Sequence, residues 1–252
     1  MAWKMWRYDC YNLRMYKPAD IDLFLDIGAT AGDVFLMARI LFPFSRVVGI
    51  EPCKAYFEFL KHFATRSTQC YNIALGNGSP MWFKESRKSG QHKFVPDDIG
   101  TYSVESKTLS QIFDDYKLDS DSRFILKCDC EGGERFLLED GEQSLALIRK
   151  SMQFNLELHL GAWNSREDWS KFLNELQETH NIYLGGWVRE GKTKLKYLYV
   201  RFDSELTINS GWLNIMAQKR FEGFPDGDLY YHSLEPAWRY YCDNKKFQLE
   251  TP

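Results

Sequence analysis

The sequence predicts an α/β fold, a doubly wound and mostly parallel sheet with antiparallel strands at one edge. Two patterns predict this fold. From Leu23 to about Leu160, short apolar runs alternate with longer amphipathic runs, as strands alternate with helices in right-handed crossover units. After residue 180, three strand-like runs follow one another without a helix between them, which indicates antiparallel strands closing one sheet edge.

The alternating part contains the elements expected to form the parallel sheet. Pro43 ends the first amphipathic run, which indicates a helix boundary. A loop rich in Gly, Pro, Asp and Ser is expected from about Ser86 to Ser106. The expected strands are 22–28, 46–52, 70–77, 80–86, 123–130 and 152–160, and the expected helices are 33–42, 55–66, 107–116 and 133–148.

The second part begins with an amphipathic helix expected over 165–180, with Ser165 as its cap. The strands expected after this helix are 181–190, 192–202 and 211–220. We expect a single domain over residues 1–220, of which 1–20 form a helical extension. An aromatic-rich tail over 221–252 is expected to pack on this domain.

Composition narrows the class of protein. With 252 residues, 44% hydrophobic and 27% charged, the chain can bury one sizeable core. The formal net charge is -3 and the basic residues are scattered among acids, so nucleic acid is not an expected partner. Charged residues interrupt the N-terminal region, and no run of about 18 uncharged apolar residues occurs, so neither a secretory signal nor a membrane span is expected.

The six cysteines are dispersed along the chain, which favours a reducing cytoplasm. Cys128 and Cys130 share one face of an expected strand, where residues i and i+2 are poorly placed for a disulfide. Spacing typical of zinc ligands is absent, so no metal is expected.

The stretch "LFLDIGATAGDVF", which begins at Leu23, indicates a ligand site. In a doubly wound sheet, ligands bind at the carboxyl ends of the strands. Gly28 and Gly32 are expected to let the chain turn tightly and bring backbone close to a ligand. The next strand ends at Glu51, about 25 residues after the first strand, where an acid can accept both ribose hydroxyls. The turn and the acid together predict a nucleoside site.

The identity of the nucleoside follows from two residues. The dinucleotide fingerprint requires a glycine where Thr30 stands, because the pyrophosphate lies there. Asp26 would repel a diphosphate but suits a ligand with an ammonium or sulfonium cation, which points to S-adenosylmethionine. The expected cofactor-binding residues are Asp26, Gly28, Ala29, Thr30, Gly32, Asp33, Glu51, Pro52, Ala74 and Asp129.

An enzyme that transfers the methyl group of S-adenosylmethionine needs residues that align the acceptor and remove its proton. Asp129 closes an expected strand, with Lys127 on the same face, and either binds a ligand or caps the helix expected near Gly132. Glu157 and His159 also share one strand face. His159 has an ordinary pKa suited to a general base, and a hydrogen-bonded core histidine is the alternative. We therefore expect Asp129, His159 and Glu157 to be catalytic, with Glu157 orienting His159 or a substrate hydroxyl.

Six segments between about Leu23 and Leu160 resemble the FkbM-type methyltransferases in order and spacing, among them "VVGIEPCKAYFEFLKHF" and "SRFILKCDCEGGERFLLEDGEQSL". The strongest family marker, K-x-D-x-E-G-x-E, corresponds to Lys127, Asp129, Glu131, Gly132 and Glu134. Acids in a first helical turn are also favoured by the helix dipole, so Glu131 and Glu134 have a structural alternative, although the resemblance keeps Glu131 as a candidate. The chain departs from the family pattern at Thr30, Ser110 and Gly133.

The resemblance implies a class I methyltransferase (Rossmann-like) fold and S-adenosylmethionine-dependent O-methylation. It implies a sugar hydroxyl in a glycan or glycoside as acceptor, with a deoxysugar such as rhamnose among the candidates. Two alternatives stay open. One is a methyltransferase acting on RNA ribose or a protein side chain, and the other is a binding module that holds S-adenosylmethionine without catalysis.

Overall fold

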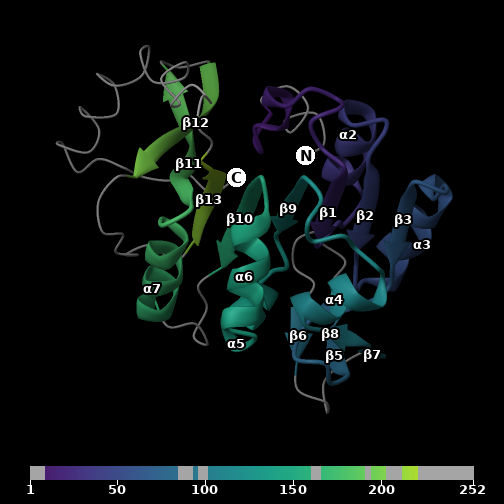
Figure 1. The fold of residues 1–252 in the computed structure, drawn as a ribbon. Helices are drawn as coiled ribbons and strands as arrows, with labels where there is room; N and C mark the ends of the chain where they lie inside the picture. The colour runs from purple at the N-terminus through teal and green to yellow at the C-terminus, as the bar shows by residue number, and fades with distance from the viewer. Residues whose placement is uncertain are drawn as a thin grey trace.

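The computed structural model describes residues 9–84, 93–95, 102–159, 166–190, 194–202 and 212–220. In these residues, an eight-stranded sheet has the order β12-β11-β13-β10-β9-β1-β2-β3 (Figure 1). Its strands are β1 (Leu23–Ile27), β2 (Arg46–Ile50), β3 (Thr68–Tyr71), β9 (Phe124–Cys128), β10 (Gln153–His159), β11 (His180–Glu190), β12 (Lys194–Phe202) and β13 (Trp212–Lys219).

Strand direction confirms the expected sheet. The neighbours β3, β2, β1, β9 and β10 are all parallel. Strand β13 is antiparallel to both β10 and β11, and β12 is antiparallel to β11, so β13 and β12 are the reversed strands. The chain passes from β1 to β2 and β3 on one side and later to β9 and β10 on the other. The strand order therefore switches between β1 and β9, the place where ligands bind in such sheets.

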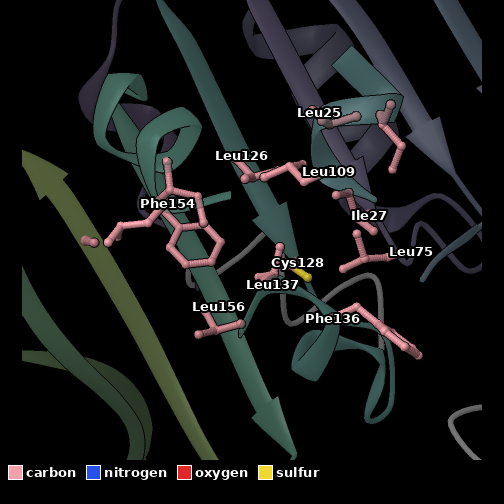
Figure 2. Packing of buried hydrophobic residues seen from close by; sticks show 14 of the residues in the cluster. Leu25, Ile27, Leu75, Leu109, Leu126, Cys128, Phe136, Leu137, Phe154 and Leu156 are labelled. Atoms are coloured by element: carbon pink, nitrogen blue, oxygen red, sulfur yellow. The ribbon is translucent and has the colours of Figure 1, made fainter. Parts of the chain in front are cut away.

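Helices cover both faces of the sheet. On one face, α2 (Asp33–Leu41) and α3 (Lys54–Leu60) pack with the 3-10 helix η1 (Leu13–Met15) in a core that includes Phe24, Val47 and Ile125. The other face carries α4 (Leu109–Asp115), α5 (Phe136–Glu139), α6 (Glu142–Lys150) and α7 (Arg166–Leu176). Figure 2 shows Leu126 and Phe154 of this second face with residues of the covering helices.

The alternation of side chains decides where polar residues lie. Successive residues of a strand point to opposite faces of the sheet. Phe24 and Ile125 belong to the core under α2, so Asp26 and Lys127, two positions later, lie on that same face. The apolar residues between them, such as Leu25 and Leu126, belong to the opposite core. Polar groups therefore gather on the α2 face, toward the carboxyl ends of the strands.

Three expected elements differ from the structure. The expected strand 70–77 is divided, because β3 ends at Tyr71 and β4 (Ala74–Leu75) pairs with β8 (Ser106–Lys107) in a separate two-stranded sheet. Part of the expected loop 86–106 forms strands that pair with β5 (Met81–Lys84), namely β6 (Lys93–Val95) and β7 (Tyr102–Val104). The expected helix 133–148 is broken between α5 and α6, where Gly141 has a φ of 58°.

Some expectations fall outside the described residues, namely the tail 221–252, the cap Ser165 and residues 1–8 of the helical extension. The described part of that extension contains η1. A search of the described helices finds none with the length and hydropathy needed to cross a membrane.

Candidate active site

Polar groups at the carboxyl ends of the strands fall into two sets. We call Asp26, the turn 28–32 and Glu51 the β1–β2 side. We call Asp129, Glu131, Glu134, Glu157 and His159 the β9–β10 side. Both sets lie at the switch point of the sheet.

The turn after β1 is bound to the end of β2. The backbone N–H groups of Gly28 and Ala29 donate to the carbonyl of Ile50 at 2.9 and 3.0 Å. A Cβ atom at Gly28, whose φ is 78°, would lie 1.7 Å from the carbonyl oxygen of Asp129. Glycine is therefore required here because the backbone after β9 lies so close. The sequence had predicted that the glycine makes room for a ligand. Gly32, with a φ of 87°, is the residue from which α2 starts.

Glu51 is buried and held by backbone donors. Its Oε1 accepts a hydrogen bond from the N–H of Cys53 at 2.7 Å, and its Oε2 accepts one from the N–H of Thr30 at 2.6 Å. Burial raises the pKa of Glu51 to about 7, although both N–H groups act in the opposite direction. Each carboxylate oxygen keeps further acceptor capacity. The buried carboxylate therefore fits a ligand that brings two hydroxyl donors, as a ribose does.

Asp26 and Lys127 form a buried ion pair. They are register partners in β1 and β9, and they are 0% and 3% exposed. The Lys127 Nζ lies 2.9 Å from Oδ1 of Asp26 and donates to the carbonyl of Gly28 at 2.7 Å. Burial acts to lower the pKa of Lys127, but the carboxylates of Asp26 and Asp129 hold it above its usual value. The structure thus gives Asp26 a cation from the chain itself, and a contact of Asp26 with a ligand cation stays a prediction.

The remaining expected cofactor residues surround the β1–β2 side. Asp33 is half-buried at the start of α2, and burial raises its pKa. The carbonyl of Pro52 accepts hydrogen bonds from Asn72 and Tyr102. Ala74 packs with Cys53 in a small core, so it lies beside the segment that follows Glu51 although it is no longer part of β3.

Asn72 is a residue that sequence reasoning missed on this side. Its Nδ2 donates to the carbonyl of Glu51 at 2.9 Å as well as to that of Pro52 at 3.0 Å. It ties the chain after β3 to the end of β2. A lone asparagine within an apolar run gives no sequence signal for this contact.

His159 is the centre of the β9–β10 side. Its Nδ1 lies 3.2 Å from Oε1 of Glu134. Its Nε2 lies 3.6 Å from Oε1 of Glu157 and 3.8 Å from Oε2 of Glu131. Burial acts to lower the pKa of His159, but hydrogen bonds to Glu134 and Glu157 raise it to about 11. These hydrogen bonds therefore favour the imidazolium form of His159 over the neutral form.

Glu134 is fully buried and fixed by backbone donors. Its Oε1 accepts from the N–H of Cys130 at 2.7 Å, and its Oε2 accepts from the N–H of Gly132 at 2.9 Å. The sequence favoured a structural role for this acid, at the start of a helix. The family marker contains Glu134, but its contact with His159, 25 residues away in sequence, requires the fold.

Asp129 lies where the two sides meet. Its Oδ2 is 3.8 Å from the Nζ of Lys127, which also contacts Asp26. Burial raises the pKa of Asp129 to about 8, with Lys127 acting in the opposite direction. The 3-10 helix η3 (Gly133–Arg135) follows Gly132 and has no side-chain cap, so Asp129 does not cap it. Asp129, Glu131 and His159 each offer a ligand atom within 4.8 Å of the others.

Two comparisons relate this chain to known methyltransferases. A family model described as the methyltransferase FkbM domain matches residues 26–183, more than half of the chain. Methyltransferase FkbM from Methylobacillus flagellatus matches with a TM-score of 0.47 and 15% identity, over 79% of this chain and 44% of that chain. This chain thus spans less than half the length of that protein.

Two further solved structures match at lower scores. Precorrin-6y C5,15-methyltransferase from Geobacter metallireducens has a TM-score of 0.43 and 15% identity, over 84% of this chain and 86% of that chain. TrmK from M. capricolum, in complex with S-adenosyl-homocysteine, has a TM-score of 0.40 and 10% identity, over 95% of this chain and 87% of that chain. A comparison with curated proteins finds no match.

Proposed function

Since this chain belongs to the FkbM methyltransferase family, we propose that it transfers a methyl group from S-adenosylmethionine to a hydroxyl group of a sugar in a glycan or glycoside. Residues 26–183 are an S-adenosylmethionine-dependent methyltransferase domain. One observation carries the choice of acceptor, namely the group of carboxylates around His159 beside the β1–β2 side. A sugar presents several neighbouring hydroxyl donors, and carboxylates are acceptors for such donors.

The β1–β2 side is assigned to the cofactor. Glu51 is proposed to accept the ribose hydroxyls, and the turn 28–32 to lie against the nucleoside. When bound, S-adenosylmethionine supplies a methyl group on a positively charged sulfur. The carboxylates of Asp26 and Glu51 are buried at this edge of the sheet, with Lys127 beside Asp26, and they are proposed to attract the cationic sulfonium or ammonium group.

The β9–β10 side is assigned to the acceptor. Asp129 and Glu157 are proposed to accept hydrogen bonds from the sugar and to include the group that takes its proton. An imidazolium cannot take a proton, so the proposed role of His159 in this charge state is to position the carboxylates and the acceptor oxygen.

The compartment is part of the proposal. The described cysteines Cys10, Cys53, Cys70, Cys128 and Cys130 are free thiols. Free thiols persist in a reducing environment. We therefore propose that the reaction takes place in the cytoplasm.

Calorimetry with S-adenosylmethionine, followed by methyl transfer to a panel of glycosides, RNA and protein acceptors, tests the proposal. We expect binding to the full chain, no detectable binding to Glu51→Ala, and unchanged binding to Glu58→Ala, whose side chain is exposed on α3. We expect turnover on glycosides. Unchanged affinity of Glu51→Ala contradicts the cofactor site, turnover on RNA or protein alone contradicts the sugar acceptor, and binding without any turnover supports a binding module instead.

A further inference from the structure

We infer that Asp129, Glu131 and His159 bind a divalent cation that holds the hydroxyl group to be methylated, an inference that rests on the proposed function. These residues come from two segments, the end of β9 with the turn after it, and the end of β10. Local spacing could not indicate such a site, because His159 is 28 residues beyond Glu131. The absence of zinc-like spacing therefore has no bearing on it.

The distances suit coordination. The three ligand atoms lie within 4.8 Å of one another, and Nε2 of His159 is 3.8 Å from Oε2 of Glu131. A cation held at about 2.0 to 2.3 Å by nitrogen and oxygen ligands separates those ligands by up to roughly twice that distance. A single ion can therefore contact all three groups after side-chain adjustments of a fraction of an ångström.

The orientation of His159 is an independent indication. Its Nδ1 faces Glu134, a fully buried carboxylate that backbone N–H groups hold in place. This arrangement leaves Nε2 facing Glu131 and Glu157. Histidines that bind metals characteristically donate their second ring N–H to a carboxylate, which fixes the ring and its tautomer. Glu134 supplies that partner here.

The local charge also favours a cation. The carboxylates of Asp129, Glu131, Glu134 and Glu157 surround His159. Lys127 is the nearest lysine, 3.8 Å from Oδ2 of Asp129, but it lies closer to Asp26 and to the carbonyl of Gly28. Several carboxylates in a partly buried site repel one another unless cations compensate them. A dication supplies that charge.

The ligand set indicates the class of ion. Two carboxylates suit Mg²⁺ and Mn²⁺, and an imidazole suits transition metals, so a mixed set favours Mn²⁺. Three protein ligands leave coordination positions for water and for a hydroxyl of the acceptor. Positive charge beside a hydroxyl group lowers its pKa.

The reaction is balanced without a further reactant. The O–H bond of the sugar breaks and its proton passes to Glu157, which lies 3.6 Å from Nε2 of His159 and outside the three ligands. The sugar oxygen forms a bond to the methyl carbon. The bond between that carbon and sulfur breaks, and its electron pair remains on sulfur.

A titration of the full chain with Mn²⁺ tests the site. The electron paramagnetic resonance signal of the free ion measures how much Mn²⁺ stays unbound. We expect one bound ion, and at least about tenfold weaker binding to Glu131→Gln and to His159→Gln. Glu178→Gln is the matched control, because Glu178 is exposed and pairs with Arg149, which precedes the start of β10, whereas His159 is at the end of β10. Wild-type protein that binds no Mn²⁺, or variants that bind it as wild type does, overturns the inference.

A chelator separates this inference from the proposed function. We expect EDTA to leave S-adenosylmethionine binding intact and to abolish methyl transfer to glycosides. We expect added Mn²⁺ to restore methyl transfer. Methyl transfer that persists in EDTA overturns the cation site and leaves the proposed function standing. Mn²⁺ binding that depends on Glu131 and His159, in a chain that does not bind S-adenosylmethionine, overturns the proposed function and leaves the cation site standing.

Discussion

The β1–β2 side and the β9–β10 side carry buried charge in different ways. On the β1–β2 side each carboxylate has its own partners, since Glu51 accepts two backbone N–H groups and Asp26 forms an ion pair with Lys127. On the β9–β10 side several carboxylates share His159. In the first arrangement each carboxylate has its own partners from the chain, and Glu51 keeps acceptor capacity for a ligand. The second has excess negative charge, which is the state expected of a site that acts on a ligand.

The largest expected effect comes from breaking the link between the two sides. Lys127→Met removes the cation that contacts both Asp26 and Asp129, and leaves the carboxylate of Asp26 buried without a cation. We expect the free energy of unfolding to fall by about 3 to 5 kcal/mol, measured by urea denaturation. The double variant Asp26→Asn/Lys127→Met should lose less, because no unpaired charge remains. A loss below about 1 kcal/mol in the single variant would show that the pair does not hold the two sides together.

The second effect separates the sides by function. His159→Gln keeps a polar side chain but removes the imidazole ring that contacts Glu134 and Glu157. We expect kcat to fall by about 100-fold or more, with the dissociation constant of S-adenosylmethionine unchanged within about twofold. Glu51→Ala should show the opposite pattern, in which the main effect is the loss of S-adenosylmethionine binding. A fully active His159→Gln enzyme removes His159 from the mechanism.

The contrast between the sides also explains what could be predicted from the sequence. The strands β1, β2, β9 and β10 were predictable because each is a short apolar run that ends in a charged or glycine-containing turn. The period of two then placed Lys127 with Asp129, and Glu157 with His159. The parallel order followed from the alternation of helices and strands, and the antiparallel edge followed from strand-like runs with no helix between them.

Contacts between distant segments could not be predicted in the same way. Gly28 is required by the carbonyl of Asp129, 101 residues later, although the local sequence indicated a ligand. Glu134 was identified as a helix-start acid, and only the packing of η3 against the end of β10 brings it to His159. The break at Gly141 depends on a backbone conformation that an amphipathic pattern does not reveal. Local periodicity therefore specifies the strands, and the shared site arises from their assembly.

The smallest effect tests the β1–β2 side alone, through pH. Burial raises the pKa of Glu51 from 4.5 to about 7 in the folded protein without ligand, and ribose hydroxyls donate to the ionised form. Only the ionised fraction binds well, so the affinity for S-adenosylmethionine should rise about tenfold from about pH 6 to about pH 8, measured by calorimetry. In Glu51→Gln this slope should vanish, which separates Glu51 from other titrating groups. A slope that persists in the variant assigns the titration elsewhere.

The same raised pKa has an opposite consequence for the protein without ligand. Because the pKa of Glu51 is higher in the folded state than its ordinary value of 4.5, the unfolded chain loses this proton first as the pH rises. The contribution of Glu51 to the free energy of unfolding is therefore largest below about pH 4.5, and it is lost as the pH rises through about 7. S-adenosylmethionine opposes that loss by binding the ionised form, so the increase in melting temperature on adding it should grow over the same range. An increase in melting temperature that does not change with pH would mean that the ribose does not contact Glu51.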